Sequence, residues 1–297
     1  MNDLADLFPG FASHWIDTQA GRIFARASGS GPPLLLLHGY PQTHVMWHRL
    51  AARLAQTFSV VAMDLRGYGW SSAPRSAKGA EYSKRLMGED AIAVMESLGH
   101  THFSLVGHDR GGRVGYRLAL DHPGRVDKLA VLDIMPTADM WNGMDAARAM
   151  QTYHWLFLAQ PEPMPETLIG KAPVEYLEHT LASWTAAKDL RSFDARALAH
   201  YRAAFNDPSR IHAACEDYRA GATIDHAFDM ADSAAGKTIA SPLLALWGDA
   251  GIPGQGASPL AVWRKWAPNA SGQAISGGHF LPEENPEATL AALLAFL

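Results

Sequence analysis

The sequence has little of what marks secreted, membrane-bound and nucleic-acid-binding proteins. Its single cysteine, Cys215, permits no internal disulfide and favours a reducing compartment. The N-terminus has neither the positive nor the apolar region of a signal peptide, and no apolar run approaches the ~20 residues that span a bilayer. A net charge of -5 offers no basic surface for nucleic acid or an anionic membrane. We therefore expect a cytoplasmic protein with neither of these partners.

Motifs for metals and nucleotides are also missing. None of the 14 histidines stands in an H-E-x-x-H pattern, and no G-x-x-x-x-G-K-[ST] phosphate loop occurs. We therefore expect no metal site and no cofactor.

The composition is that of a globular chain. Of 297 residues, 48% are hydrophobic and 19% are charged, which suits one large α/β domain or a domain with an insertion. Apolar runs rich in Leu, Val and Ile alternate with helical patterns; the runs are 33–37, 60–65, 103–106, 129–134 and 243–247. Strands that are apolar throughout and alternate with helices indicate a parallel sheet covered on both faces.

The alternation is interrupted after Ile134. Residues 137–235 are rich in aromatic side chains and have the pattern of helices joined by proline-containing loops. Alternation then resumes and ends in a helix predicted over residues 286–297. We predict an α/β core formed by residues 1–136 and 236–297, with a helical cap over residues 137–235.

One strand-to-helix junction contains a carboxylate between glycines. The stretch VGHDRGGR, residues 106–113, has the frame G-x-D-x-G, which differs from the hydrolase signature G-x-S-x-G only at its centre. A helix-capping aspartate does not require both Gly107 and Gly111, whereas a sharp strand-to-helix turn does. The pattern therefore predicts that Asp109 lies on a nucleophile elbow.

Three further predicted strands end in residues suited to catalysis. Asp133, Asp249 and His279 each follow a strand, and an open parallel sheet binds ligands at the carboxyl ends of its strands. The order nucleophile, acid, histidine is that of α/β-hydrolases. Either Asp133 or Asp249 satisfies this order, so the sequence leaves the acid open between them. The backbone N–H groups of Tyr40 and Arg110 are the expected oxyanion hole.

A carboxylate nucleophile suggests alkyl transfer. A serine that attacked an sp³ carbon would form an ether, whereas an aspartate forms an ester, which a histidine-activated water can hydrolyse. Asp109 thus points to displacement of a halide from carbon or to opening of an epoxide.

Two arginines follow the nucleophile. Arg110 and Arg113 are three residues apart, so both can share one helix face near its positive N-terminus. A guanidinium suits bidentate binding of a carboxylate, and two of them would offset repulsion between Asp109 and an anionic substrate. These residues predict a small halogenated carboxylic acid as substrate.

Six motifs resemble the fluoroacetate dehalogenases of the α/β-hydrolase superfamily, and the likeness runs from end to end of the chain. They are HGYPQ (38–42), GHDRGGR (107–113), YHW (153–155), CEDYRAG (215–221), LALWG (244–248) and GGHFLPEE (277–284). The resemblance implies hydrolysis of a haloacetate, with fluoroacetate foremost, to glycolate and halide through an aspartyl ester. It also implies a homodimer that needs no cofactor.

The same resemblance implies roles for single residues. The family's halide-binding trio matches His154, Trp155 and Tyr218, and Trp184 lies in a similar segment as a pocket-lining or gating residue. The family's acid matches Asp133. Tyr40 stands where the family commonly has phenylalanine, although its backbone N–H would serve equally well.

Two rival functions follow from the same residues. An epoxide hydrolase would use cap tyrosines to protonate the opening oxygen, and the available ones are Tyr153, Tyr176, Tyr201 and Tyr218. Related epoxide hydrolases usually have tryptophan where this chain has Arg110, which argues against that function. A non-catalytic receptor with a hydrolase fold often loses part of the triad, whereas here all three members are present.

Overall fold

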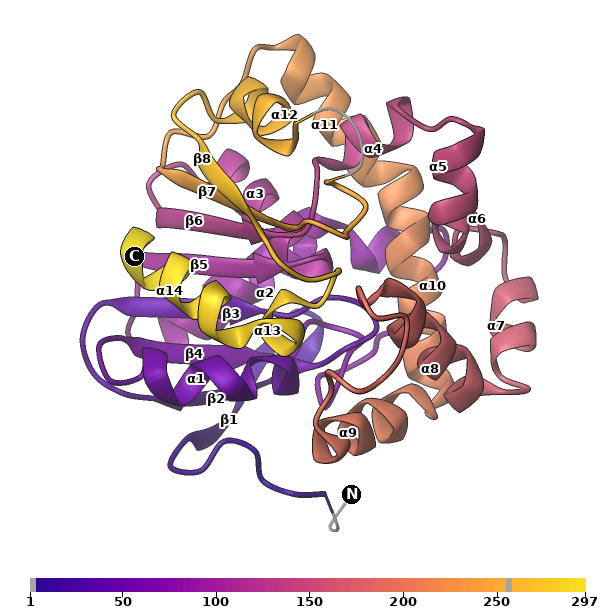
Figure 1. The fold of residues 1–297 in the computed structure, drawn as a ribbon, viewed down its shortest axis with the longest axis horizontal. Coiled ribbons are helices and arrows are strands. Elements are labelled where there is room, and N and C mark those ends of the chain that lie inside the picture. The colour runs from indigo at the N-terminus through magenta and orange to yellow at the C-terminus, as the bar shows by residue number, and fades with distance from the viewer. Residues whose placement is uncertain (1–3, 255–257) are drawn as a thin grey trace.

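The computed structural model describes residues 4–254 and 258–297, and these build a sheet with helices on both faces (Figure 1). The eight described strands run in the order β1-β2-β4-β3-β5-β6-β7-β8. β1 (Ala12–Thr18), β2 (Gly21–Ser28) and β4 (Ser59–Met63) pair antiparallel at one side. The other pairs are parallel and comprise β3 (Pro33–Leu37), β5 (Phe103–His108), β6 (Val126–Leu132), β7 (Leu243–Gly248) and β8 (Ser271–Ile275). An α/β fold with a mostly parallel sheet is thereby confirmed.

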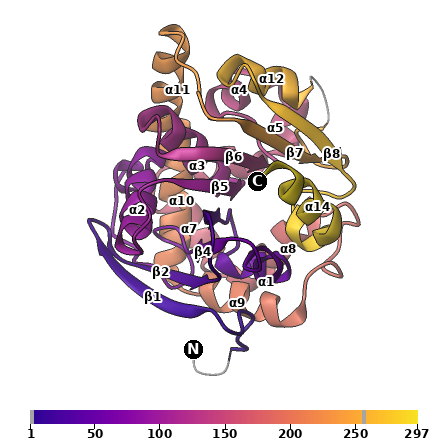
Figure 2. The ribbon, with the colours of Figure 1, turned by 90° about the vertical axis from the view of Figure 1, so that its left-hand side faces the viewer.

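Helices bury the two faces of this sheet. Figure 2 shows α2 (Lys84–Ser97) and α3 (Arg110–Asp121) on one face and α1 (His48–Leu54) and α14 (Pro286–Phe296) on the other. α12 (Pro259–Trp266) packs beside β7, and the short 3-10 helices His44–Trp47 and Ala80–Tyr82 precede α1 and α2. The central strands are almost wholly buried, as their continuous apolar runs predict.

Two strands end earlier than the predicted apolar runs, at the carboxyl edge of the sheet. The run over 129–134 leaves the sheet after Leu132, because Asp133 takes a left-handed conformation with φ of 52°. The run over 60–65 likewise ends as a strand at Met63. The hairpin of β1 and β2 has no counterpart in the predicted runs, because β1 is a half-exposed edge strand rather than an apolar one.

Helices α4 to α11 are inserted between β6 and β7, and we call them the inserted helices. They are α4 (Thr137–Asn142), α5 (Ala146–Gln151), α6 (Tyr153–Leu158), α7 (Met164–Ile169), α8 (Pro173–Trp184), α9 (Ala195–Phe205), α10 (Pro208–Ala222) and α11 (Ile224–Ala234). Figure 1 shows α5 to α10 beyond the carboxyl ends of the central strands, whereas α11 lies alongside α3, where Asp229 and Asp232 pair with Arg117. α10 is the most buried of them, with every residue from 211 to 221 buried. Across the described chain, no helix combines the length and apolarity that crossing a membrane requires.

Candidate active site

Asp109 occupies a strained turn between β5 and α3. Its φ of 44° and ψ of -114° are unusual for a residue with a side chain, and neighbouring glycines make room for the turn. A Cβ on Gly107 would lie 2.5 Å from the carbonyl oxygen of Gly111, and one on Gly111 would lie 2.4 Å from that of Leu37. The backbone therefore needs both glycines, and the turn places the buried Asp109 side chain at the carboxyl end of β5.

The two oxygens of Asp109 have different surroundings. Oδ2 accepts a hydrogen bond of 2.9 Å from the backbone N–H of Tyr40, while Oδ1 accepts none from that group. Arg110 opens helix α3, so its N–H has no intrahelical acceptor. Burial alone would raise the pKa of Asp109, but the charges of His279, Arg110 and Arg113 lower it below its ordinary value. The carboxylate is therefore ionised at neutral pH.

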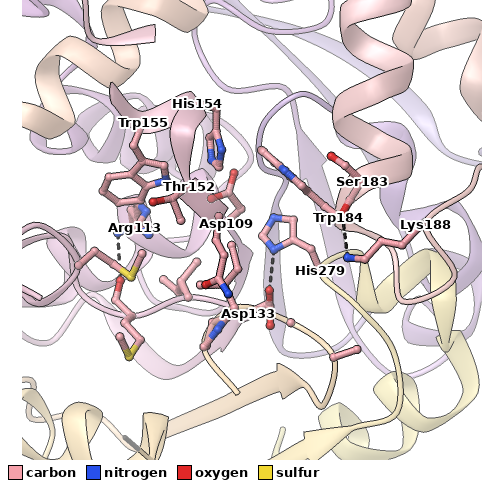
Figure 3. A pocket seen from close by; sticks show the side chains of 18 residues that line it. Asp109, Arg113, Asp133, Thr152, His154, Trp155, Ser183, Trp184, Lys188 and His279 are labelled. Atoms are coloured by element: carbon pink, nitrogen blue, oxygen red, sulfur yellow. Dashed lines mark hydrogen bonds and ion pairs between the residues drawn. The ribbon is translucent and has the colours of Figure 1, made fainter. Parts of the chain in front are cut away.

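The structure brings Asp133, and not Asp249, to His279. The Nδ1 of His279 lies 2.6 Å from Oδ2 of Asp133, whose Oδ1 accepts the N–H of Gly248 at 2.9 Å. The carboxylate of Asp249 is exposed and accepts instead the N–H of Gly277 at 3.1 Å. In Figure 3 the His279 ring lies between Asp133 and Asp109. Its Nε2 is buried and has no hydrogen-bond partner among the described residues.

The surroundings of His279 shift its pKa upward. Burial acts to lower the pKa, but the hydrogen bond to Asp133 and the charges of Asp133 and Asp109 outweigh it. The imidazole is thus a stronger base than an exposed histidine. Its free Nε2 is the atom through which a proton could be taken up.

Arg110 is held by a carboxylate of the inserted helices. Its Nε lies 3.1 and 3.2 Å from the two carboxylate oxygens of Asp217, and Nη2 lies 2.7 Å from Oδ1 and 2.8 Å from the backbone oxygen. Asp217 also accepts from Lys84 and, at 2.7 Å, from the Tyr68 hydroxyl. Asp217 therefore occupies the Nε–Nη2 edge of this guanidinium.

Arg113 is buried without a carboxylate partner in the described part of the chain. Its Nη1 donates to the carbonyl of Met135 at 3.0 Å and to the hydroxyl of Thr137 at 3.1 Å, whereas its Nε is buried and unpartnered. Burial and the like charge of Arg110 lower the pKa of Arg113. A bound anion would offset both effects by stabilising the charged form of Arg113. The Nε–Nη2 edge, which suits a bidentate carboxylate, is the one that Arg113 keeps free of a protein carboxylate.

Aromatic and imidazole groups from the inserted helices meet above Asp109. The His154 ring lies 4.3 Å from Trp184 and 5.7 Å from Tyr218, and the rings of Trp155 and Tyr218 are 6.1 Å apart, all between centroids. Burial lowers the pKa of His154 to about 3 and raises that of Tyr218 well above its ordinary value. Both groups are therefore neutral, and the trio predicted from the resemblance is brought together.

Of these groups, His154, Trp155 and Trp184 border a cavity of about 250 Å³ (Figure 3). The core contributes Asp109, Arg113, Asp133 and His279 to its wall, and the inserted helices and the loops that follow them contribute His154, Trp155, Trp184 and Lys188. Three predicted site residues do not line it: Tyr40, Arg110 and Tyr218. The Tyr40 ring packs behind the wall, 5.3 Å from the ring of Tyr218 and 6.0 Å from that of Trp184. Lys188 is exposed, donates from Nζ to the carbonyl of Ser183 at 2.9 Å and adds a positive charge to the cavity wall.

Two features of this site were not predicted from the sequence. Asp217 lies within the motif CEDYRAG, but its pairing with Arg110, 107 residues earlier in the chain, leaves no local signal. Lys188 lies in a loop where a single lysine has no periodic or motif context. The sequence signal that could have revealed the pair is an acidic residue, Asp217, within an otherwise buried helix, because a buried carboxylate is usually paired with a cation.

One other group of residues resembles a metal site. Glu162, Glu166 and His212 place ligand atoms within 4.8 Å of one another in the inserted helices. However, Arg75 and Arg219 already pair with the two glutamates. The backbone N–H of Ser76 donates to Nε2 of His212 at 3.4 Å, which leaves the proton on Nδ1, the atom that faces the glutamates. This arrangement disfavours a cation.

Comparison with known proteins gives consistent relatives. The family model for the α/β hydrolase fold matches residues 32–286. A fluoroacetate dehalogenase from Burkholderia sp. is 44% identical over 98% of this chain and 95% of its own, and a soluble epoxide hydrolase from Corynebacterium sp. is 31% identical over 91% of each. A putative α/β hydrolase from Nostoc sp. PCC 7120 superposes with a TM-score of 0.94 at 52% identity, covering 97% of this chain and 98% of that one. A putative epoxide hydrolase from Pseudomonas aeruginosa gives 0.93 at 45% identity, covering 99% and 97%.

Proposed function

The chain belongs to the α/β-hydrolase family, and on that premise we propose that it hydrolyses the carbon–halogen bond of a haloacetate, with fluoroacetate as the favoured substrate. The products are glycolate and halide. One observation carries the proposal: an ionised Asp109 on its elbow lies beside a buried Arg113 that has no carboxylate partner in the described chain. The similarity to the Burkholderia fluoroacetate dehalogenase supports it.

In the first step, the substrate carboxylate binds the free edge of Arg113, and Nη1 of Arg110 adds a further donor. Oδ1 of Asp109 then attacks the carbon that carries the halogen, so a C–O bond forms as the C–halogen bond breaks. The halide leaves toward the N–H and O–H groups of His154, Trp155 and Tyr218. Because all three are neutral donors, they receive the growing negative charge without a proton transfer.

In the second step, His279 takes a proton from a water molecule through Nε2 while the water oxygen attacks the Asp109 carboxyl carbon. The N–H groups of Tyr40 and Arg110 hold the oxyanion that develops on Oδ2. Asp133 keeps the imidazole in the required tautomer and stabilises it when charged. Breakdown transfers the proton from His279 to the departing glycolate oxygen, and Asp109 returns to a carboxylate by releasing the second proton of the attacking water to solvent.

Epoxide hydrolysis is the second candidate, because epoxide hydrolases are among the relatives and the nucleophile would be the same. It needs a tyrosine hydroxyl opposite Asp109. Tyr201 donates instead to Glu283 at 2.5 Å, and none of the four tyrosines is among the residues that line the cavity. Of the four, only Tyr218 lies close enough to Asp109 for that carboxylate to raise its pKa. The geometry therefore favours the haloacetate. A non-catalytic receptor would have no use for a paired Asp133 and His279.

We also propose that the inserted helices form a cap domain over residues 137–235, with residues 1–136 and 236–297 as the core domain. A cytoplasmic homodimer is the remaining part of the proposal. Apolar side chains exposed on the neighbouring helices α5, α6 and α7 support a dimer, and they include Met150, 80% exposed, and Leu168, 52% exposed. Sedimentation at several protein concentrations tests it.

The decisive experiment uses two substrates and labelled water. Purified protein should release fluoride from fluoroacetate, and it should form little diol from styrene oxide; the reverse result would replace the proposed function by epoxide hydrolysis. In a single turnover with excess enzyme in ¹⁸O-water, the label should enter the Asp109 carboxylate and not glycolate. Label in glycolate would mean direct attack by water and would eliminate the ester.

A further inference from the structure

The loop that carries His279 is fixed along its backbone. We call residues 278–280 the base loop. The N–H groups of Gly278 and Phe280 each donate to the carboxylate of Glu284 at 2.9 Å, and that of His279 donates to the carbonyl of Trp184 at 2.9 Å. Glu284 is the last residue of α13 (Leu281–Glu284). All three consecutive N–H groups of the base loop thus have an acceptor.

The same carboxylate also binds the inserted helices. Residues 184–186, which begin with the last residue of α8, form what we call the docking segment. The N–H of Ala186 donates to Oε2 of Glu284 at 2.8 Å, the oxygen that also accepts from Gly278. A Cβ on Gly278 would lie 2.5 Å from the carbonyl oxygen of Trp184, so the two backbones are in direct contact. One carboxylate therefore joins two segments that are about one hundred residues apart in the chain.

We propose that Glu284 is a positioning residue that holds the base loop and the docking segment as one unit. His279 reaches its working position only when Glu284 accepts the hydrogen bonds of both segments. The proposal rests on the proposed function. It extends that function by assigning a separate control to the second chemical step.

The contacts of the docking segment explain why the two steps would differ. The ring of Trp184 lies 5.2 Å from that of His279 and packs against Phe280 in a stacked arrangement. Asp109, by contrast, is fixed by its elbow and by the N–H of Tyr40, neither of which involves Glu284. Loss of Glu284 should therefore leave the attack by Asp109 intact and impair the water attack that needs His279.

The test is Glu284→Gln against Glu287→Gln. A glutamine amide in place of the Glu284 carboxylate could accept only through one oxygen, so at least one N–H would face its amide donor. Glu287 is exposed, and no hydrogen bond from it to either segment occurs in the described chain, so it is a matched loss of charge. For Glu284→Gln we expect a halide burst of one equivalent at the wild-type rate, followed by turnover slowed about tenfold or more, which is the loss of one charge-assisted hydrogen bond. Intact mass after quenching should show a carboxymethyl group on Asp109.

Glu287→Gln should behave as wild type. The size of the burst counts folded active sites. A burst and a later phase that fell together in Glu284→Gln would show that Glu284 supports the whole site and not the second step, and this would overturn the proposal. Equal rates in both variants, with no accumulated ester, would overturn it as well.

A substrate-free measurement separates this proposal from the proposed function. If wild-type protein released no halide, the haloacetate assignment would fail, and the role of Glu284 would be decided by NMR titration of the His279 ring alone. That ring is faced by Asp133, Asp109, His108, His154 and Glu284. Loss of the Glu284 charge and of loop anchoring should lower the pKa of His279 and broaden its signals. An unchanged titration curve would refute a positioning role.

Discussion

In the part of the chain that the structure describes, the protein supplies a paired negative charge to Arg110 but none to Arg113. Mutating each arginine should therefore separate an effect on stability from an effect on activity. Arg110 is paired with Asp217 at full burial, whereas Arg113 has only neutral acceptors in the residues that the structure describes. We expect Arg113→Met to remove activity while leaving the protein nearly as stable as the wild type. We expect Arg110→Met to reduce both.

The magnitudes follow from the contacts. Arg113→Met loses two neutral hydrogen bonds worth about 1 kcal/mol each, and relief of an unpaired buried cation offsets part of this loss. Arg110→Met leaves the buried Asp217 with only Lys84 and the Tyr68 hydroxyl, and breaking such a pair costs about 3–5 kcal/mol. The free energies of unfolding of the two variants should therefore differ by about 2 kcal/mol or more. For catalysis, a lost bidentate contact of two charge-assisted bonds should lower kcat/KM of Arg113→Met at least about hundredfold.

Urea unfolding with and without acetate measures both effects. Acetate has the carboxylate but no leaving group, so it should raise wild-type stability as a ligand of the native state. The rise should vanish in Arg113→Met. The reasoning would be refuted if Arg113→Met were destabilised as much as Arg110→Met, or if acetate stabilised it as it does the wild type.

Three further expectations can be checked with single variants. Asp133→Asn should slow ester hydrolysis greatly because the imidazole loses the acceptor that fixes its tautomer, while Asp249→Asn should cost little; quenched-flow kinetics would show the reverse if Asp249 were the acid. Trp155→Phe and Tyr218→Phe should slow fluoroacetate turnover about tenfold to a hundredfold, and chloroacetate turnover less, because fluoride needs donors more; equal losses would limit both residues to shaping the pocket. Glu283→Gln should stabilise the protein, because burial raises the pKa of Glu283 to about 8 whereas the unfolded carboxyl titrates near about 4.3. Between these values the unfolded state loses its proton first, so wild-type stability falls by up to about 1.4 kcal/mol per pH unit, and the advantage of the variant should grow from about pH 5 to 8 in urea unfolding.

The parts of the molecule that the sequence predicts are those with short-range causes. The buried strands appear as continuous apolar runs, and the elbow at Asp109 appears as two glycines, because a missing Cβ is the only way to make that turn. β1 escapes prediction because an edge strand that is half exposed has no apolar run. Local patterns therefore locate the sheet and the nucleophile.

Relations across the chain are less accessible. Order along the sequence allowed Asp133 or Asp249 as the acid, and only the left-handed turn at Asp133 shows which carboxylate reaches His279. The pairing of Arg110 with Asp217 and the link from Glu284 to Ala186 join residues about one hundred positions apart. Neither has a spacing that periodicity could reveal, because each depends on how the inserted helices settle on the sheet.

The ion pair between Arg110 and Asp217 joins the sheet portion of the chain to the inserted helices. This limits which insertions from related proteins could replace the inserted helices. The arginine belongs to the sheet portion and the aspartate to the insertion, so a chimaera that received a foreign insertion without a carboxylate at position 217 would bury an orphaned guanidinium. By the usual cost of such a charge, about 3–5 kcal/mol, most of the stability of an ordinary domain would be at risk. Positions 110 and 217 should accordingly be exchanged together, and an insertion from a relative with an uncharged residue at position 110 would fit this sheet only after Arg110 had been replaced.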